Sequence, residues 1–187
     1  FRSFDMSVIE ITGLVFGVVP IVIEILKSYR TTKERLNTFR KYGQVIHDVQ
    51  LRYRVAATSF TNDCQLLLKT VVDDARELPE MLGDPQHSAW QDPQLEARFR
   101  TFLERDYTLF EEIVLLIREV LRDTQFALKD CEKQAGGGSA QLTAAQRLYQ
   151  AFNIARKENQ YRRWLDTLDQ WNSKLSKLRK QRCKLSK

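Results

Sequence analysis

The sequence contains little glycine, proline, cysteine or histidine. Seven glycines and four prolines in 187 residues argue against a turn-rich all-β fold. The three cysteines, Cys64, Cys131 and Cys183, are far apart and cannot all pair, so a disulfide framework is not expected and a reducing, intracellular compartment is indicated. Neither His47 nor His87 follows a glutamate by three positions, as a di-iron bundle requires, and no zinc-site spacing occurs. We therefore expect no metal and no cofactor.

Catalytic motifs are also absent. The sequence contains no phosphate-binding P-loop, no G-x-S-x-G nucleophile motif and no H-E-x-x-H metalloprotease motif. Its adjacent acidic pairs, Asp73-Asp74 and Glu111-Glu112, would point in different directions on a helix and would not form a paired-carboxylate site. These absences predict a protein that has no catalytic residues and is not an enzyme.

The charge is predominantly basic, but it is unevenly distributed. The 30 Lys and Arg outnumber the 24 Asp and Glu, and the sequence pI is about 9.3. Residues 1–26 carry a net charge of −2, residues 27–54 of +6, residues 55–155 of −6 and residues 156–187 of +8. The two basic segments could be solvated helix faces, or they could attract anionic lipid or nucleic acid. Because no nucleic-acid-reading motif is present, we expect no nucleic-acid partner.

Apolar residues recur at helical spacing along most of the chain. This pattern predicts an all-α fold: a four-helix-bundle-like domain with a short apolar N-terminal helix and long second, third and fourth helices. Residues 1–5 resemble a vector remnant, because Met6-Ser7 reads as a natural start. We expect residues 6–187 to form a single helical-bundle domain with an apolar helix (7–29), a helix (31–78), a loop (79–93), a helix (93–132), a Gly-rich link (135–139) and a helix (143–182).

Local signals underlie these boundaries. Thr31 and Glu34 match the capping-box pattern at the start of a helix, and Pro20 is expected to kink the helix before it. The Gly-rich link is either native or an engineered replacement for a longer loop. The apolar stripes of the predicted helices include Cys64, Trp164 and Trp171, which we expect in the core.

The first helix is apolar on nearly all sides. Its segment Ile11–Ile23 contains thirteen residues and no charge, so it must be enclosed either by a protein core or by lipid. It would cover only ~20 Å of the ~30 Å hydrocarbon layer, so we do not expect it to be a standing transmembrane span. The small residues Gly13 and Gly17 suit close helix packing in either setting. Two interpretations remain open: a buried core helix, or a helix that is sheltered in one state and membrane-inserted in another.

The run from Met6 to Leu26, with its Gly-Leu-x-x-Gly motif followed by proline, resembles the opening helix of the HeLo-like (HELL) group of fungal cell-death domains. The resemblance continues in the pattern Trp164-Leu165-x-x-Leu168-x-x-Trp171-Asn172-x-x-Leu175. It implies a bundle akin to the executioner domain of mixed-lineage kinase-like proteins and to fungal incompatibility toxins. In such domains a signalling partner induces oligomerisation, and the N-terminal helix then engages the membrane.

The resemblance and the charge pattern together predict a membrane-targeting, cell-death effector that permeabilises membranes after oligomerisation. Its expected partners are anionic membrane lipids, further copies of the chain and an upstream receptor or signalling partner. Its expected location is the cytoplasm, with movement to the plasma membrane on activation. The alternative is a regulatory interaction or oligomerisation module without membrane activity. The expected inserting residues are Ile11, Gly13, Leu14, Phe16, Gly17, Val18, Pro20 and Ile21, and the expected anionic-lipid contacts are Lys27, Arg30, Lys33, Arg40, Lys41, Lys177, Arg179 and Lys180.

Overall fold

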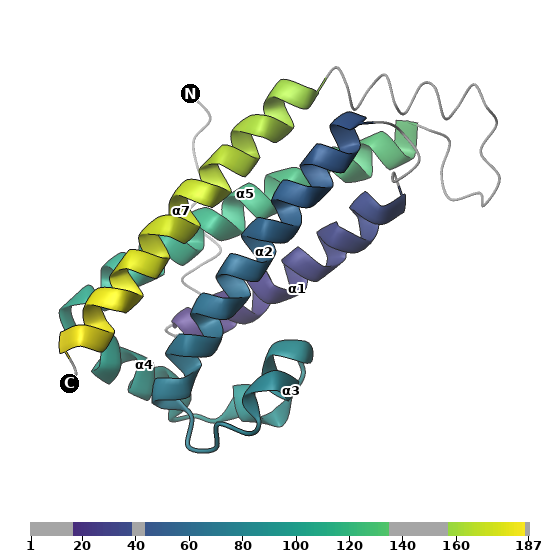
Figure 1. Cartoon of the computed structure of the whole chain (residues 1–187). Helices are drawn as coiled ribbons and strands as arrows, with labels where there is room; N and C mark the ends of the chain where they lie inside the picture. Colours follow the sequence, from purple (N-terminus) through teal and green to yellow (C-terminus); the bar gives the residue numbers. More distant parts are fainter. Residues whose placement is uncertain (1–16, 39–43, 135–156, 186–187) are drawn as a thin grey trace, which may run out of the picture.

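The computed structural model describes residues 17–38, 44–134 and 157–185 (Figure 1). Within these ranges the chain is helical and contains no strand, which confirms the predicted all-α fold. The elements are α1 (Val18–Thr38), α2 (Gln44–Val71), α3 (Leu78–Gly83), the 3-10 helix η2 (Ser88–Gln91), α4 (Leu95–Leu103), the 3-10 helix η3 (Glu104–Asp106), α5 (Tyr107–Gln134) and α7 (Glu158–Leu185).

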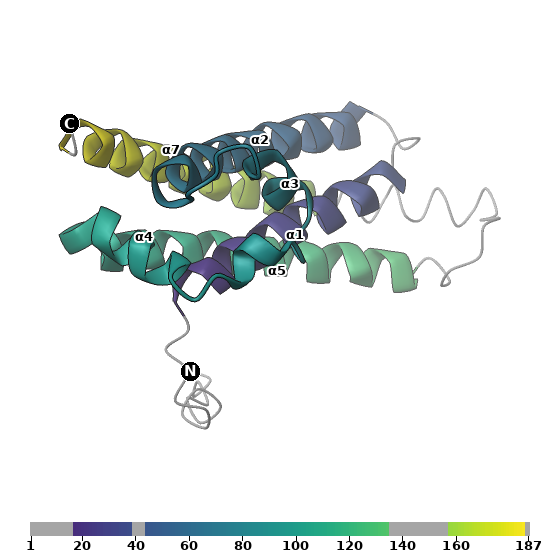
Figure 2. The same ribbon diagram turned by 90° about the horizontal axis from the view of Figure 1, so that it is seen from below.

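The four long helices form a bundle in which each packs against two others. α1 packs on α5 and α2, and α7 packs on α2 and α5. The helices α2 and α5 therefore lie on one diagonal of the bundle, and α1 and α7 lie on the other (Figures 1 and 2). Because α2 and α5 follow one another among the long helices but are not side by side, α3, η2 and α4 carry the chain across one end of the bundle.

Side chains from all four long helices build the core. The ring centroid of Tyr29 in α1 lies 5.4 Å from that of Tyr53 and 5.6 Å from that of Phe60, both in α2. Ile117 of α5 and Leu168 of α7 are fully buried. Cys64 is also buried, as the sequence predicts, and burial raises the pKa of its thiol well above 9.0.

Two polar side chains of α7 point into the bundle and attach this helix to α2. The Asn172 side-chain amide donates a hydrogen bond to the carbonyl oxygen of Ala56 at 3.0 Å. Arg179 Nε lies 2.7 Å from Asp63 Oδ1, and the two side chains are only 11% and 6% exposed. Both partners are on α2, so sliding α7 along α2 would break both contacts. These contacts therefore set the register of the two helices.

The predicted boundary between the first two helices is wrong. α1 continues through Thr31 and Glu34 to residue 38, so these residues do not start a helix. Thr32 and Leu36 are buried and extend the core-facing side of α1 by two further turns. This tertiary packing outweighs the local capping preference on which the prediction rested.

The ends of α1 and α2 also differ from the predicted ones. α2 ends at Val71, earlier than predicted, and Asp74 Oδ1 then accepts a hydrogen bond from the Arg76 backbone N–H at 2.9 Å in a turn. At the start of α1, Pro20 lies in the first turn. Backbone N–H groups of a first turn have no acceptor within the helix, so proline causes no kink there, contrary to the prediction. Residues 7–16 of the predicted first helix lie outside the described residues.

The predicted loop 79–93 contains the short helices α3 and η2. α3 has Pro79 in its first turn, where proline is tolerated. Trp90 Nε1 donates a hydrogen bond to the Met81 carbonyl oxygen at 2.8 Å, and both side chains are buried. Prolines predicted a loop here, but burial of these large side chains stabilises two helical turns.

The predicted helix 93–132 is two helices. α4 ends at Leu103, η3 follows, and Glu104 adopts a positive φ of 48°. Arg182 of α7 donates from Nε and Nη2 to the Phe102 carbonyl oxygen at 3.1 and 2.7 Å. It thereby provides the hydrogen-bond donor that a continuing α4 would have provided. Because Leu103 and Tyr107 keep the helical spacing across the break, apolar periodicity could not reveal it.

The last helix, α7, ends three residues after the predicted position. Residues 143–156 of the predicted helix, the Gly-rich link and residues 1–5 lie outside the described residues. Trp164 and Trp171 are half-buried and pack against the edge of the core rather than within it.

Replacing Arg179 with Met should lower the free energy of unfolding by about 3–5 kcal/mol, because Asp63 would become a buried charge without a partner. The double variant Asp63→Leu/Arg179→Met should recover most of this loss, since neither apolar side chain needs a counter-charge. Urea denaturation measures the free energy of unfolding of both variants. As a control, Arg76→Met breaks an exposed pair with Asp74 and should leave the urea midpoint nearly unchanged. Equal losses of free energy in the single and double variants would show that the loss does not come from an unpaired Asp63 charge.

Alkaline pH should also destabilise the fold. Burial raises the pKa of Tyr53 well above its ordinary value of 10.0, and burial likewise raises the pKa of Tyr29. Above pH 10 the unfolded chain loses these protons while the folded chain keeps them, so the stability present below pH 10 is lost as the pH rises further. Urea midpoints measured from pH 8 to 11 should therefore fall above pH 10, and less steeply in Tyr53→Phe. An unchanged slope in that variant would exclude Tyr53 as a contributor.

Candidate functional site

The apolar N-terminal run enters the bundle at the first turn of α1, and side chains from α4 and α5 bind the backbone there. The Val18 N–H donates a hydrogen bond to the Tyr107 hydroxyl at 3.2 Å, and the Val19 N–H donates to Glu96 Oε2 at 3.0 Å. The Tyr107 hydroxyl in turn donates to Glu96 Oε1. These contacts satisfy two of the N–H groups that a helix start leaves without partners. The negative carboxylate also lies at the positive end of the α1 dipole.

Arg100 completes this arrangement, and we call Glu96, Arg100 and Tyr107 the α1 cap. The Arg100 Nε atom lies 3.5 Å from Glu96 Oε1, and its guanidinium carbon lies 4.1 Å from the centroid of the Tyr107 ring. Burial, and next the hydrogen bond to Glu96, raise the pKa of the Tyr107 hydroxyl above its ordinary value of 10.0. The hydroxyl therefore stays protonated at neutral pH and can donate to the carboxylate.

Gly17 is the residue at which close approach requires the absence of a side chain. A Cβ atom at this position would overlap the carboxylate group of Glu96. Gly17 is buried, and it directly precedes the two backbone N–H groups that the α1 cap binds. The role of Gly17 in this fold is therefore to let the cap reach the backbone.

Beyond the cap, the apolar face of α1 is buried in the bundle. Of the expected inserting residues, Gly17, Val18 and Ile21 are buried, whereas Pro20 is exposed. Ile11, Gly13, Leu14 and Phe16 lie outside the described residues. Among the helices that the structure describes, none is both long enough and apolar enough to cross a membrane.

Charged contacts attach the outer side of α1 to α5. Glu24 Oε2 lies 3.4 Å from Arg118 Nη1, and Glu24 Oε1 lies 3.5 Å from Arg122 Nη2. One turn later the Gln125 side chain donates a hydrogen bond to the Ser28 carbonyl oxygen at 3.1 Å. The contacts advance together along both helices, so α1 and α5 run parallel.

The expected lipid-contacting residues have different environments. On α1, Lys27, Arg30 and Lys33 are exposed, although Arg30 also donates a hydrogen bond to the Gly83 carbonyl oxygen. On α7, Lys177 and Lys180 are both exposed. Arg40 and Lys41 lie outside the described residues.

Arg179 does not fit the expected role. Its side chain turns inward to the Asp63 carboxylate and is 11% exposed, so in this fold it is not available to a lipid surface. A buried carboxylate needs a cationic partner, and Arg179 is the residue of the basic segment that faces it. Sequence position within a basic run could not distinguish this arginine from its exposed neighbours.

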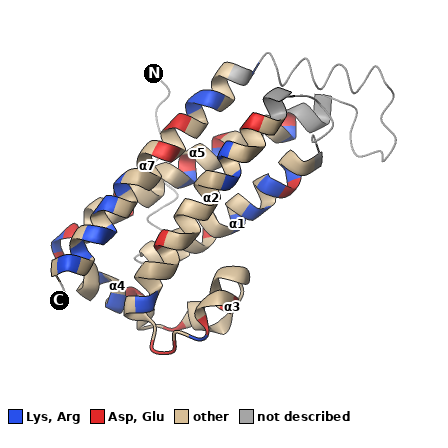
Figure 3. Ribbon diagram, in the orientation of Figure 1, with Lys and Arg blue, Asp and Glu red and all other residues tan. Residues whose placement is uncertain are grey.

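The described basic residues of the two basic segments are distributed over three helices of the bundle. α1 and α7, which carry most of them, occupy opposite corners, because each packs on α2 and α5 (Figure 3). The first basic segment also includes Arg52 and Arg54 of α2, and α2 packs directly on α7. Part of the first basic segment therefore lies next to the second.

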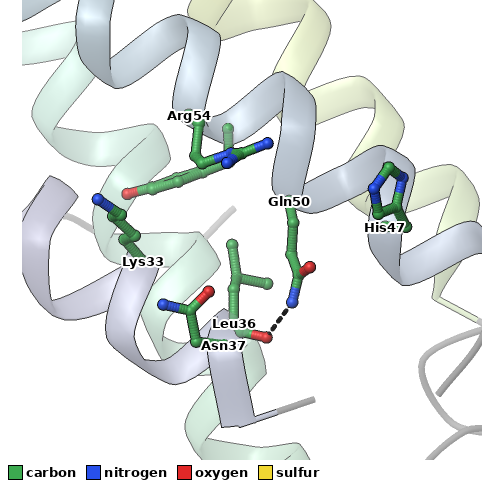
Figure 4. A pocket seen from close by; sticks show the side chains of 7 residues that line it. Lys33, Leu36, Asn37, His47, Gln50 and Arg54 are labelled. Atoms are coloured by element: carbon green, nitrogen blue, oxygen red, sulfur yellow. Dashed lines mark hydrogen bonds between the residues drawn. The ribbon is translucent and has the colours of Figure 1, made fainter. Parts of the chain in front are cut away.

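Lys33 also borders a cavity of about 260 Å³ between α1 and α2 (Figure 4). Its other polar lining residues are Asn37 of α1 and His47, Gln50 and Arg54 of α2. This grouping was not predicted from the sequence. The spacing of the three α2 residues places them near one face of a helix, but only packing of α1 on α2 brings Lys33 and Asn37 to them.

Within the described part of the chain, no group of three or more His, Cys, Asp or Glu side chains is placed to hold a metal ion. Comparison of the chain with protein-family models, with curated proteins and with solved structures gives no match. The α1 cap, the outward-facing basic residues and the Lys33 cavity are therefore the features from which a function has to be inferred.

Gly17→Ala should lower the free energy of unfolding by about 1–2 kcal/mol, because the new methyl group displaces Glu96 and the α1 cap loses its hydrogen bonds. Gly83→Ala is the matched control: no atom lies within 4 Å of the added methyl group, so the change should stay within ~0.5 kcal/mol. Urea denaturation measures both variants.

A double-mutant cycle tests whether the loss acts through Glu96. In the background Glu96→Ala, where the carboxylate is already missing, Gly17→Ala should cost much less than in the natural chain. Equal costs of Gly17→Ala in the two backgrounds would show that the loss has another cause.

Proposed function

We propose that this chain is a membrane-targeting effector domain of the cell-death type, in which self-association releases the N-terminal apolar helix into an anionic membrane. The observation that carries the proposal is the enclosure of the described half of the apolar run, attached at its first turn by the α1 cap. A helix that is apolar on nearly all sides needs such an enclosure in a closed state and could exchange it for lipid in an open one. The HeLo-like resemblance of the N-terminal run supports the same function.

The energetics of α1 favour a domain that stays closed until it is triggered. Seven apolar side chains of α1 between Val18 and Tyr29 are buried. At ~1.5–3 kcal/mol each, their exposure to water would cost on the order of 10–20 kcal/mol. This cost matches or exceeds the ~5–15 kcal/mol by which a typical domain is stable. Release therefore requires compensation from lipid burial and from contacts between copies, which an upstream receptor or signalling partner would promote.

The exposed basic residues would add attraction to an anionic leaflet. Lys27 and Arg30 lie on the outward side of α1, next to the buried Leu26 and Tyr29. Each basic side chain near such a surface contributes about 1 kcal/mol. The domain would thus reside in the cytoplasm when closed and concentrate at the plasma membrane when active.

Vesicle leakage tests the proposal. The full chain, brought together by a fused inducible dimerisation domain, should bind and permeabilise vesicles that contain anionic lipid, and it should act much less on neutral vesicles. Lys27→Glu/Arg30→Glu should reduce leakage severalfold through lost attraction. Lys69→Glu/Arg105→Glu changes the net charge equally at two exposed positions outside the expected contacts and should retain leakage. The proposal fails if the dimerised full chain neither binds nor permeabilises anionic vesicles.

A second candidate function, protein–protein interaction without membrane activity, is favoured by a groove between α5 and α7. The groove has a volume of about 370 Å³ and a mainly apolar lining that includes Ile113, Trp171 and Leu178. Leu109 and Leu116 at its edge are 48% and 36% exposed. A stable dimer in solution, combined with no vesicle binding, would favour this function over the first.

A further inference from the structure

The cavity between α1 and α2 collects cationic and amide side chains around an apolar floor. Lys33 and Asn37 come from successive turns of α1, and His47, Gln50 and Arg54 come from successive turns of α2 (Figure 4). Leu36 and Tyr53 complete the lining. No aspartate or glutamate is among these lining residues. The cavity is therefore surrounded by hydrogen-bond donors and positive charge.

The cations of this cavity lack the partners that neighbouring cations have. Arg52, two residues before Arg54, lies 2.7 Å from an oxygen of Asp166 and 2.9 Å from an oxygen of Asp169. In the described part of the chain, neither Lys33 nor Arg54 forms an ion pair. Two cationic side chains that border one cavity without a carboxylate repel each other, and a bound anion would remove this repulsion.

A further polar group borders the same space. The Gln50 side-chain nitrogen donates a hydrogen bond to the Leu36 carbonyl oxygen near the end of α1, which holds the amide in place (Figure 4). Tyr53 also lines the cavity, but its side chain is almost completely buried and its hydroxyl is not exposed to the open space. The polar groups available to a ligand are therefore those of the lysine, arginine, histidine and amide side chains.

We propose that this cavity binds a phosphate monoester. Ammonium and guanidinium groups form short, charge-assisted hydrogen bonds with phosphate oxygens, and the fork of an arginine can donate to two of them. Lys33 and Arg54 supply the charge, and Asn37 and His47 supply further polar groups at the rim. The phosphate could belong to a lipid headgroup or to a soluble ester, and the site does not depend on membrane permeabilisation.

The soluble arm of the test titrates the full chain with glycerol 3-phosphate at constant ionic strength and follows backbone amide signals by NMR. Saturable shifts should concentrate on α1 and α2 around Lys33, Gln50 and Arg54. Lys33→Gln/Arg54→Gln should weaken binding at least tenfold. Lys69→Gln/Arg105→Gln makes the same charge change at exposed residues away from the cavity and should bind like the natural chain. Equal urea midpoints of the variants establish that both are folded.

The lipid arm compares vesicles containing phosphatidic acid, a monoester, with vesicles containing phosphatidylglycerol, a diester. Preference for phosphatidic acid that is lost in Lys33→Gln/Arg54→Gln supports the site and assigns a lipid source. Binding of glycerol 3-phosphate without any vesicle preference supports the site and assigns a soluble source. The proposal is overturned if neither probe binds saturably, or if the two double variants lose binding equally. The NMR titration and the vesicle-binding comparison do not measure leakage. A failure of the proposed membrane permeabilisation can therefore be distinguished from a failure of the phosphate site.

Discussion

The first two residues of α1, Val18 and Val19, are buried in the bundle, so their backbone N–H groups must find acceptors within the protein. Glu96 and Tyr107 meet this requirement with an oxygen each. The need for these acceptors explains several features at this end of the bundle. Gly17 leaves room for the carboxylate. The helix is interrupted at Glu104, and this interruption lets α4 and α5 both face the start of α1.

The second constraint is the set of buried polar side chains on α7. Asn172 and Arg179 bind α2, and Arg182 binds the last turn of α4. Each contact leaves a buried polar group unsatisfied if α7 shifts, and unsatisfied buried groups are expensive. α7 therefore links α2 to α4, and the α1 cap links α4 to α1. A domain closed in this way would need a strong trigger to open, consistent with the proposed activation by self-association.

The distribution of charge acquires a different meaning in three dimensions. The net charge of +6 arises largely from two basic segments, and helix packing distributes their described residues over α1, α2 and α7. One of the basic residues, Arg179, neutralises a core carboxylate. Another, Lys33, faces a second cation, Arg54, across a cavity. The basic residues thus divide into those that pair with a core carboxylate, those on the surface and those that line the cavity.

The sequence by itself determined the helical class, most of the core and the buried state of Cys64, because helical periodicity is a local property and apolar faces must be covered. It also singled out Gly17, although not its contact with Glu96. Only the tertiary structure decided that α1 continues through Thr31 and that the helix is interrupted at Glu104, because contacts with residues distant in the sequence outweigh local preferences at both positions. The roles of Arg179 and Lys33 were likewise decided by tertiary structure. Asp63 is 116 residues from Arg179, and the Lys33 cavity forms only where α1 packs on α2.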